Sequence, residues 1–149
     1  MKAMIEPAAD AARGKIVLGV DDDAATLALL AAVISAAGYT FMGAASGEDC
    51  VRLAARCVPH LVLLDIKMPG MDGFATCREL RKRPELSSVP VAFLTPRKTA
   101  EDVRTGLAAG GNDFILKPFD IERLRRRVRH WTAQRLKAAA MTGVSVLAG

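Results

Sequence analysis

Five short apolar runs alternate with five amphipathic segments along this 149-residue chain, and this alternation constrains the fold more than any other feature. Strands that alternate with helices form parallel sheets, because right-handed crossovers place a helix between successive strands. Continuous apolar strands fit a sheet that helices cover on both faces. We therefore predict an α/β fold with a doubly wound, five-stranded parallel sheet. The predicted strands span 16–20, 39–44, 61–64, 91–94 and 114–116, and the predicted helices span 24–37, 48–56, 74–81, 100–109 and 121–137.

Local signals at the helix ends agree with these ranges. Gly38 follows the first predicted helix and Gly110 the fourth, and glycine is preferred just after a helix. Ser46 is placed to cap the start of the second helix. We predict a single domain over 15–131, with an N-terminal extension over 1–14 and a C-terminal helical extension and tail over 132–149.

Composition narrows the class of protein further. Apolar residues make up 51% of the chain and charged residues 25%, which is typical of a globular protein. No apolar run reaches the roughly 20 residues that span a bilayer. We therefore predict a cytosolic protein without membrane association. The N-terminus lacks the apolar core of a signal peptide, because Glu6, Pro7 and Asp10 interrupt it. The three cysteines, Cys50, Cys57 and Cys77, lack disulfide or metal spacing and are predicted to be small buried residues.

Polar residues stand at the carboxyl ends of four of the five predicted strands. Asp21-Asp22-Asp23 follow the first strand, Asp65 the third, Thr95 the fourth and Lys117 the fifth. Ligands of open parallel sheets bind outside the carboxyl ends of the strands. We therefore expect these side chains to converge on one crevice, with Asp65 at the edge of the core.

These residue types together suit phosphoryl transfer. Carboxylates gathered in one crevice repel one another, and a cation with hard oxygen ligands, such as Mg²⁺, relieves the repulsion. Lys117 adds a second positive charge, and the Thr95 hydroxyl can donate to an anionic oxygen. A carboxylate can itself be the nucleophile, which gives an aspartyl phosphate. Asp65, central in the predicted sheet, is the best candidate.

Four stretches resemble the signature segments of the response-regulator receiver domain of two-component signalling. They are "VLGVDDDAATLALL", "LVLLDIKMPGMDGF", "VAFLTP" and "GGNDFILKPF", in the family's order and spacing, and the resemblance covers about residues 15–131. It implies a flavodoxin-like (βα)5 fold and a stand-alone, single-domain receiver. Such a protein takes a phosphoryl group from a sensor histidine kinase or a histidine phosphotransferase. It then signals to a downstream protein by a change of its surface, and its only catalysis is its own phosphorylation and dephosphorylation.

The resemblance also implies a role for each site residue. Asp65 matches the phosphoacceptor, and Thr95 and Lys117 match the pair that contacts the phosphoryl group. Asp22 would bind Mg²⁺ directly and Asp21 largely through water, with Asp65 and the backbone carbonyl of Lys67 completing the protein ligands. Phe114 matches an aromatic switch position, whose ring turns inward when Thr95 moves toward the phosphate.

Pro96 is the main departure from the family pattern. The residue after the hydroxyl is usually small, and its backbone N–H helps to hold a phosphoryl oxygen, whereas proline has no N–H and a fixed φ. We predict that phosphorylation survives but that the switch is weakened or altered. Lys67 and Arg97 occupy two positions that influence phosphoryl loss in the family. The sequence leaves open whether they crowd the attacking water, add charge stabilisation or are solvated surface charges.

Two other functions stay open at this point. A degenerate receiver would act as a phosphorylation-independent protein-binding module, which Pro96 keeps under consideration. Asp21-x-Asp23, with a later Thr95 and Lys117, also resembles the haloacid-dehalogenase type of phosphatase. That alternative leaves Asp65 without a role, and no acidic pair follows the lysine.

All of the net charge of +5 comes from the C-terminal segment: from residue 121 onward there are seven basic residues and one acid, and the first 120 residues sum to −1. This basic segment has three interpretations: a solvated helix face, a docking or dimerising surface, or a contact with the phosphate backbone of a nucleic acid. No DNA-binding motif follows, so nucleic acid is the least favoured partner, and a homodimer stays open. The basic residues are Arg123, Arg125, Arg126, Arg127, Arg129, Arg135 and Lys137.

Overall fold

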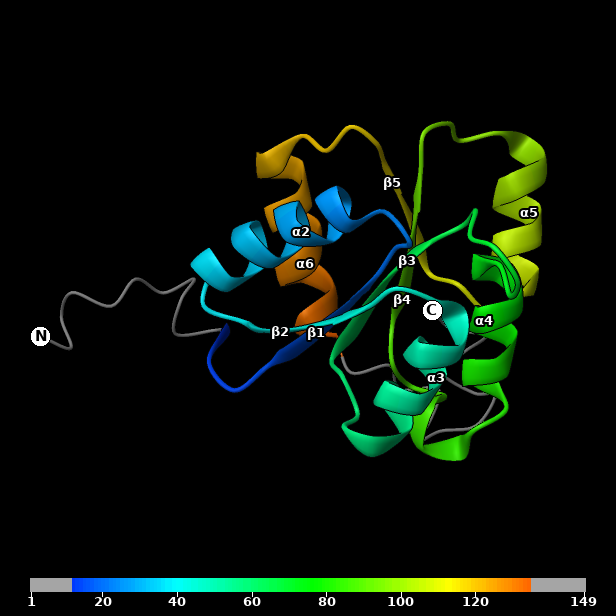
Figure 1. The fold of residues 1–149 in the computed structure, drawn as a ribbon, viewed down its shortest axis with the longest axis horizontal. Coiled ribbons are helices and arrows are strands. Elements are labelled where there is room, and N and C mark those ends of the chain that lie inside the picture. The colour runs from blue at the N-terminus through cyan, green and yellow to red at the C-terminus, as the bar shows by residue number, and fades with distance from the viewer. Residues whose placement is uncertain (1–11, 135–149) are drawn as a thin grey trace, which may run out of the picture.

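The computed structural model describes residues 12–134 and shows one parallel sheet of five strands between two layers of helices (Figure 1). The strand order is β2-β1-β3-β4-β5, so the chain reverses its direction of sheet growth between β1 and β3. The predicted doubly wound fold is confirmed. Its strands are β1 (Ile16–Val20), β2 (Thr40–Ala44), β3 (Leu61–Asp65), β4 (Val91–Thr95) and β5 (Asp113–Leu116).

Five helices cover the sheet, with α2 and α6 on one face and α3, α4 and α5 on the other (Figure 1). Each layer has its own apolar core: Leu30 and Leu124 are fully buried in one, and Cys50 and Cys77 in the other. A short 3-10 helix, η2 (Pro84–Leu86), was not predicted. The helices are α2 (Ala24–Ala36), α3 (Gly47–Arg56), α4 (Gly73–Arg81), α5 (Ala100–Ala108) and α6 (Ile121–Thr132).

Side-chain caps explain why the helices begin where they do. Asp23, Ser46 and Asp120 each accept a hydrogen bond from the backbone N–H three residues further on, which satisfies a donor that the helix leaves unpaired. The capping role of Ser46 was predicted from the sequence. The helix predicted over 121–137 ends earlier, because α6 stops at Thr132 and Ala133 is its C-cap; residues 135–137 lie outside the described residues.

Two residues differ from their predicted surroundings. Asp113, which precedes the strand predicted over 114–116, is the first residue of β5 and accepts hydrogen bonds from Arg127 at 2.7 Å and from Nε1 of Trp131 at 2.8 Å. Cys57, predicted to be buried, is exposed because it follows the last residue of α3. Asp113 therefore fastens α6 to β5, a contact between segments that local patterns do not connect.

Arg81, the last residue of α4, binds the segments that precede β4 and β5, at the end of the sheet opposite the acidic residues. Its guanidinium donates five hydrogen bonds, and burial lowers its pKa. Among the described residues no carboxylate pairs with it, so oxygen dipoles alone compensate the charge. The acceptors are the carbonyls of Leu86, Val89 and Gly110 and the side-chain oxygen of Asn112.

Candidate functional site

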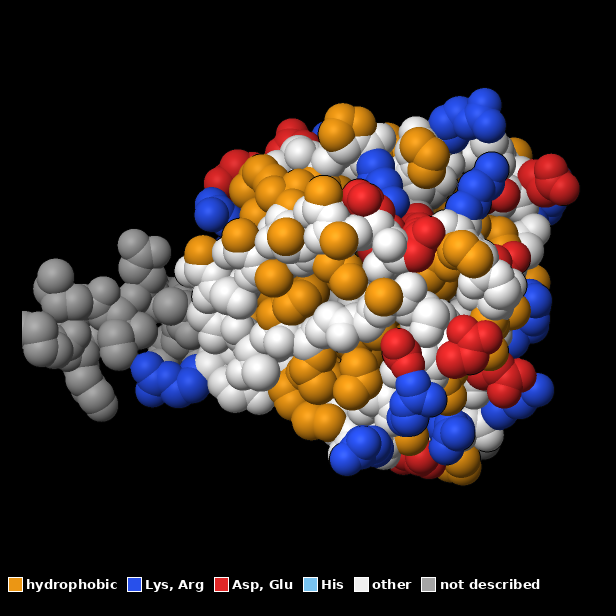
Figure 2. All heavy atoms as spheres, in the orientation of Figure 1, with side chains coloured by type: hydrophobic (Ala, Val, Ile, Leu, Met, Phe, Trp, Pro, Cys, Tyr) orange, Lys and Arg blue, Asp and Glu red, His pale blue; other side chains and the backbone are white. Residues whose placement is uncertain are grey.

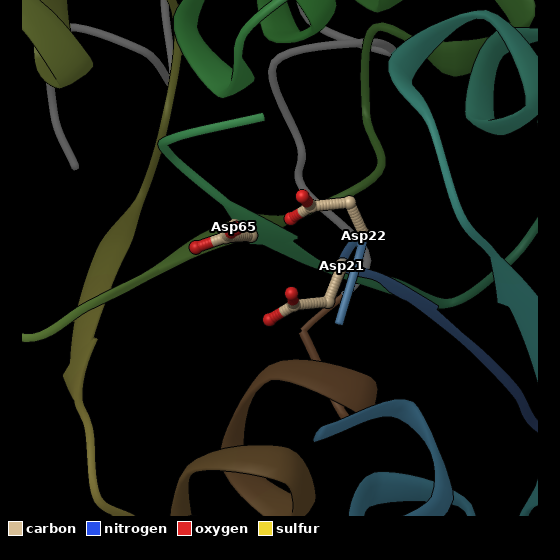
Figure 3. Close-up of side chains that lie close together, drawn as sticks. All are labelled: Asp21, Asp22 and Asp65. Carbon is tan, nitrogen blue, oxygen red and sulfur yellow. The ribbon is translucent and has the colours of Figure 1, made fainter. Parts of the chain in front are cut away.

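Three acidic side chains meet at the carboxyl edge of the sheet. Asp21 follows β1, Asp22 comes next, and Asp65 ends the neighbouring strand β3. One carboxylate oxygen from each lies within 4.8 Å of the others, and Figure 3 shows the three groups facing a common space. Asp21 is 1% exposed and Asp65 6%, whereas Asp22 is exposed to solvent. The structure thus brings together the acids that the strand-end pattern placed on one rim.

Lys117 supplies the positive charge in this cluster. It follows β5, and its Nζ donates to Oδ2 of Asp21 at 2.8 Å and to Oδ1 of Asp65 at 3.0 Å. Asp21 also accepts the backbone N–H of Asp23 at 2.9 Å, which holds its carboxylate in place. The lysine therefore ties the end of β5 to the ends of β1 and β3.

Burial and charge shift the pKa values of these groups in definite directions. Burial raises the pKa of the Asp65 carboxyl, with smaller raising contributions from Asp21 and Asp22, and Lys117 opposes the shift. Burial alone would lower the pKa of Lys117, but its hydrogen bonds to Asp21 and Asp65 outweigh that effect and raise it. Lys117 therefore stays charged at neutral pH, while ionisation of Asp65 costs more than usual.

The charge balance and donor types of the cluster fit a divalent cation. Three ionised carboxylates against one ammonium leave a local charge of −2, which a single Mg²⁺ would neutralise. All three acids offer hard oxygen ligands, the kind that Mg²⁺ prefers. Asp23, the third acid in the run, is directed elsewhere. Its carboxylate accepts from the backbone and hydroxyl of Thr26, and these bonds lower its pKa.

The hydroxyl of Thr95 is engaged by its own loop. Thr95 ends β4, is 4% exposed, and donates through Oγ1 to the carbonyl of Arg97 at 2.7 Å. The same oxygen accepts the N–H of Arg97 at 3.2 Å. Pro96, between the two, contributes no N–H. To donate to a group at the acidic cluster, the hydroxyl must therefore give up its bond to Arg97.

The loop after Asp65 folds back against the end of β3. The N–H of Gly73 donates to the carbonyl of Ile66 at 2.8 Å, and a Cβ on Gly73 would lie 2.3 Å from the carbonyl oxygen of Asp65. Only glycine permits this close approach. The side chain of Lys67 is exposed beside the site. The sequence showed a glycine here, but not the backbone contact that requires it.

Phe114, three residues before Lys117, lies inside the molecule. Its side chain is 5% exposed, and its ring centroid is 5.3 Å from that of Phe93. Gly106 in α5 provides the room, since a Cβ there would lie 2.4 Å from Cζ of Phe114. The inward position of the ring thus depends on a helix residue without a side chain.

A doubly wound domain with an acidic cluster, a lysine and a hydroxyl at one end of its sheet has the arrangement of a phosphoryl-transfer protein. Residues 17–129 match the family described as the response regulator receiver domain. The chain belongs to this family and has its phosphoacceptor signalling role.

Individual relatives agree with this assignment. The response regulator PleD of Caulobacter vibrioides is 40% identical over 120 residues, which cover 80% of this chain and 26% of PleD. A probable transcriptional regulator, ycf27, of Porphyridium aerugineum is 40% identical over 113 residues, which cover 76% of this chain and 46% of that protein. The chain therefore spans less than half the length of either relative.

Solved structures extend the agreement to the site. The receiver domain of sensor histidine kinase PA1611 from Pseudomonas aeruginosa has a TM-score of 0.76 and 30% identity, covering 81% of this chain and 99% of that one; its structure holds a magnesium ion in the active-site cleft. The Vibrio cholerae chemotaxis protein CheY4 has a TM-score of 0.77 and 26% identity, covering 78% of this chain and 98% of that one.

Over residues 12–134, no helix is long and apolar enough to cross a membrane.

Proposed function

We propose that Asp65 accepts a phosphoryl group, with Thr95 and Lys117 contacting the phosphoryl oxygens. The observation that supports this most directly is the position of the Asp65 carboxylate: it ends a fully buried strand, and Lys117 Nζ lies 3.0 Å from its Oδ1. A rigid strand end holds a nucleophile better than a mobile loop does. Neither Asp21 nor Asp22 ends a strand in this way.

The transfer itself needs little from the protein beyond positioning and charge. An oxygen of Asp65 forms a bond to phosphorus while the bond from phosphorus to the donor breaks. With a phosphohistidine donor, the electron pair of the broken P–N bond stays on the imidazole, which takes a proton from solvent. Lys117 neutralises charge on the transferred group, and the Thr95 hydroxyl donates to one of its oxygens.

Asp21, Asp22 and Asp65, with the backbone carbonyl of Lys67, would hold Mg²⁺ at this edge. The metal would supply charge neutralisation for the phosphoryl oxygens and for the three carboxylates. The ion pairs of Lys117 with Asp21 and Asp65 leave the solvent-exposed Asp22 as the acid most accessible to an arriving cation.

A sensor histidine kinase or a histidine phosphotransferase is the proposed donor, and a downstream protein that contacts the last helices is the proposed receiver of the signal. α6 buries Leu124 and Val128 and exposes Arg123, Arg126 and Arg129 to solvent. A partner with an acidic surface fits this helix.

We expect the conformational change on phosphorylation to differ from one in which the aromatic ring at position 114 moves from the surface to the interior. Phe114 is already inside, while Thr95 still bonds to Arg97, so the ring and the hydroxyl do not have to move together. This supports the prediction that phosphorylation is retained but its structural effect is altered. Structures without and with a phosphate mimic in which the Phe114 ring is outside in the first and moves inward only together with Thr95 would contradict it.

Intact-mass measurement after incubation with Mg²⁺ and a small acyl phosphate tests the proposed function. We expect one added phosphoryl group on the native chain, and none on Asp65→Asn or in the presence of a chelator. Asp72→Asn is the matched control, because it is the same change in the same loop at a helix cap where asparagine serves equally well. It should be phosphorylated normally.

Failure would take two distinguishable forms. No adduct on the native chain, together with no binding of beryllofluoride, would favour the degenerate, phosphorylation-independent binding module. Hydrolysis of a phosphate ester that survives Asp65→Asn would favour the phosphatase, although the helix-capping position of Asp23 and the family match give that alternative no support.

A further inference from the structure

Helix α2 lies on the surface without a polar face. Residues 24–47 include no charged side chain, and only Leu30 and Ile34 of α2 are buried. Leu29 is 43% exposed, and alanines occupy most of the remaining outer positions. A surface helix normally carries a charged or polar face, and a helix that is apolar all round is normally covered. Figure 2 shows this area over α2 and β2 as orange and white, with charged side chains around its margin.

Strand β2, beside α2, is an open edge of the sheet. Thr40 donates its N–H to the carbonyl of Lys15, the residue before β1, and Ala44 accepts from Asp21, the residue after it. Because backbone groups alternate along a strand, Phe41 and Gly43 direct theirs outward. Within residues 12–134 no other strand pairs with this edge. Protected edges usually carry lysine or proline, but β2 has neither, and the exposed Gly43 has no side chain to shield its backbone.

We propose that the surface formed by α2 and the outer edge of β2 joins two copies of this chain. In the pair, β2 of one copy runs antiparallel to β2 of the other about a twofold axis. The two sheets become one continuous sheet, and the two α2 helices lie side by side on one of its faces. An extended strand can pair with the outward backbone groups of both Phe41 and Gly43, and a second β2 offers the same groups in return.

The charges on α3 do not oppose a second copy. α3 packs on the opposite face of the sheet near β2, with two acids in its first turn and two arginines further along (Glu48 and Asp49; Arg52 and Arg56). A twofold axis between the two β2 strands sets the two α3 helices antiparallel. Asp49 pairs with Arg52 of its own helix, and the two acids and two arginines balance, so neither α3 brings a net charge to the contact. The uncharged α2 helices add no repulsion on the other face.

Sedimentation equilibrium of the 149-residue chain, from about 1 µM to about 1 mM, tests this proposal. We expect a mass that rises with concentration from 15.9 kDa to twice that value. Thr40→Lys, at an exposed position of β2, should raise the dissociation constant at least tenfold, as should Leu29→Lys. Leu107→Lys removes a leucine that is still more exposed (55%, against 43% for Leu29) from α5, near the far edge of the sheet, and should leave association unchanged.

Two further measurements separate this contact from folding and from phosphorylation. Amide hydrogen exchange of Phe41 and Gly43 should slow as the concentration rises, and circular dichroism should show the variants folded. Asp65→Asn should associate like the native chain, because the contact does not involve the acidic cluster. A chain that stays monomeric at every concentration would refute the proposal. So would a dimer in which Phe41 and Gly43 exchange freely, or one that Leu107→Lys disrupts equally.

Discussion

Replacing Pro96 with alanine should strengthen the binding of a phosphoryl mimic while weakening the unliganded fold. The substitution restores a backbone N–H directly after Thr95, at the end of β4. A proline at this position sets φ and offers no donor, so the loop is stiff and one hydrogen bond to a phosphoryl oxygen is missing. The two effects act on different states of the protein and have opposite signs.

The magnitude follows from one hydrogen bond and one loop residue. A hydrogen bond to a charged group contributes about 1.5–3 kcal/mol, and the freer alanine loop loses about 0.4–1 kcal/mol of that on ordering. The exchange of the Thr95–Arg97 bond occurs in both proteins and cancels. The net gain is about 0.5–2.6 kcal/mol, or about 2- to 80-fold in affinity. The free energy of unfolding without ligand should fall by about 0.4–1 kcal/mol.

Isothermal titration with beryllofluoride and Mg²⁺ measures the affinity, and urea unfolding without either measures the stability. Lys98→Ala is the control, because it changes an exposed residue of the same loop without adding an N–H. Affinities of Pro96→Ala and the native chain that agree within twofold would refute the reasoning, since the restored donor would then not face the bound group.

Three other predictions concern single substitutions. Burial raises the pKa of Asp65 in the folded chain, so ionisation of Asp65 weakens the fold as the pH rises from the ordinary pKa to the raised one. Urea unfolding without Mg²⁺ should therefore show Asp65→Asn to be more stable than the native chain at pH 7, with a smaller difference near pH 4. Gly106→Ala should cost about 1–2 kcal/mol, because overpacking against Phe114 exceeds the gain in helix propensity, and thermal unfolding checks it. Arg81→Met should cost about 3 kcal/mol or more by denaturant unfolding, because buried carbonyls lose their donors; an unchanged midpoint would show that water replaces the guanidinium.

Sequence patterns predicted the five strands and the first four helices to within one residue at each end, but they missed η2 and placed the end of the last helix too late. The first strand was predicted over 16–20 and is Ile16–Val20, because a buried parallel strand is a continuous apolar run with polar ends. Capping residues such as Ser46 were predictable for the same reason: a cap acts on a backbone group only three residues away. The strand-end rule also placed Asp21, Asp22 and Asp65 on one rim without any knowledge of strand order.

The tertiary structure alone decided which distant groups meet. Lys117 and Asp21 are 96 residues apart and pair at 2.8 Å, and Asp113 binds a helix that local patterns assign to a separate segment. The bond between Thr95 and its loop, and the room that Gly106 leaves for a ring, likewise depend on packing. Periodicity and capping act over a few residues, so the sequence by itself determined the elements and the chemistry at their ends. Contacts across the sheet depend on how all the layers pack at once, and only the folded chain specifies them.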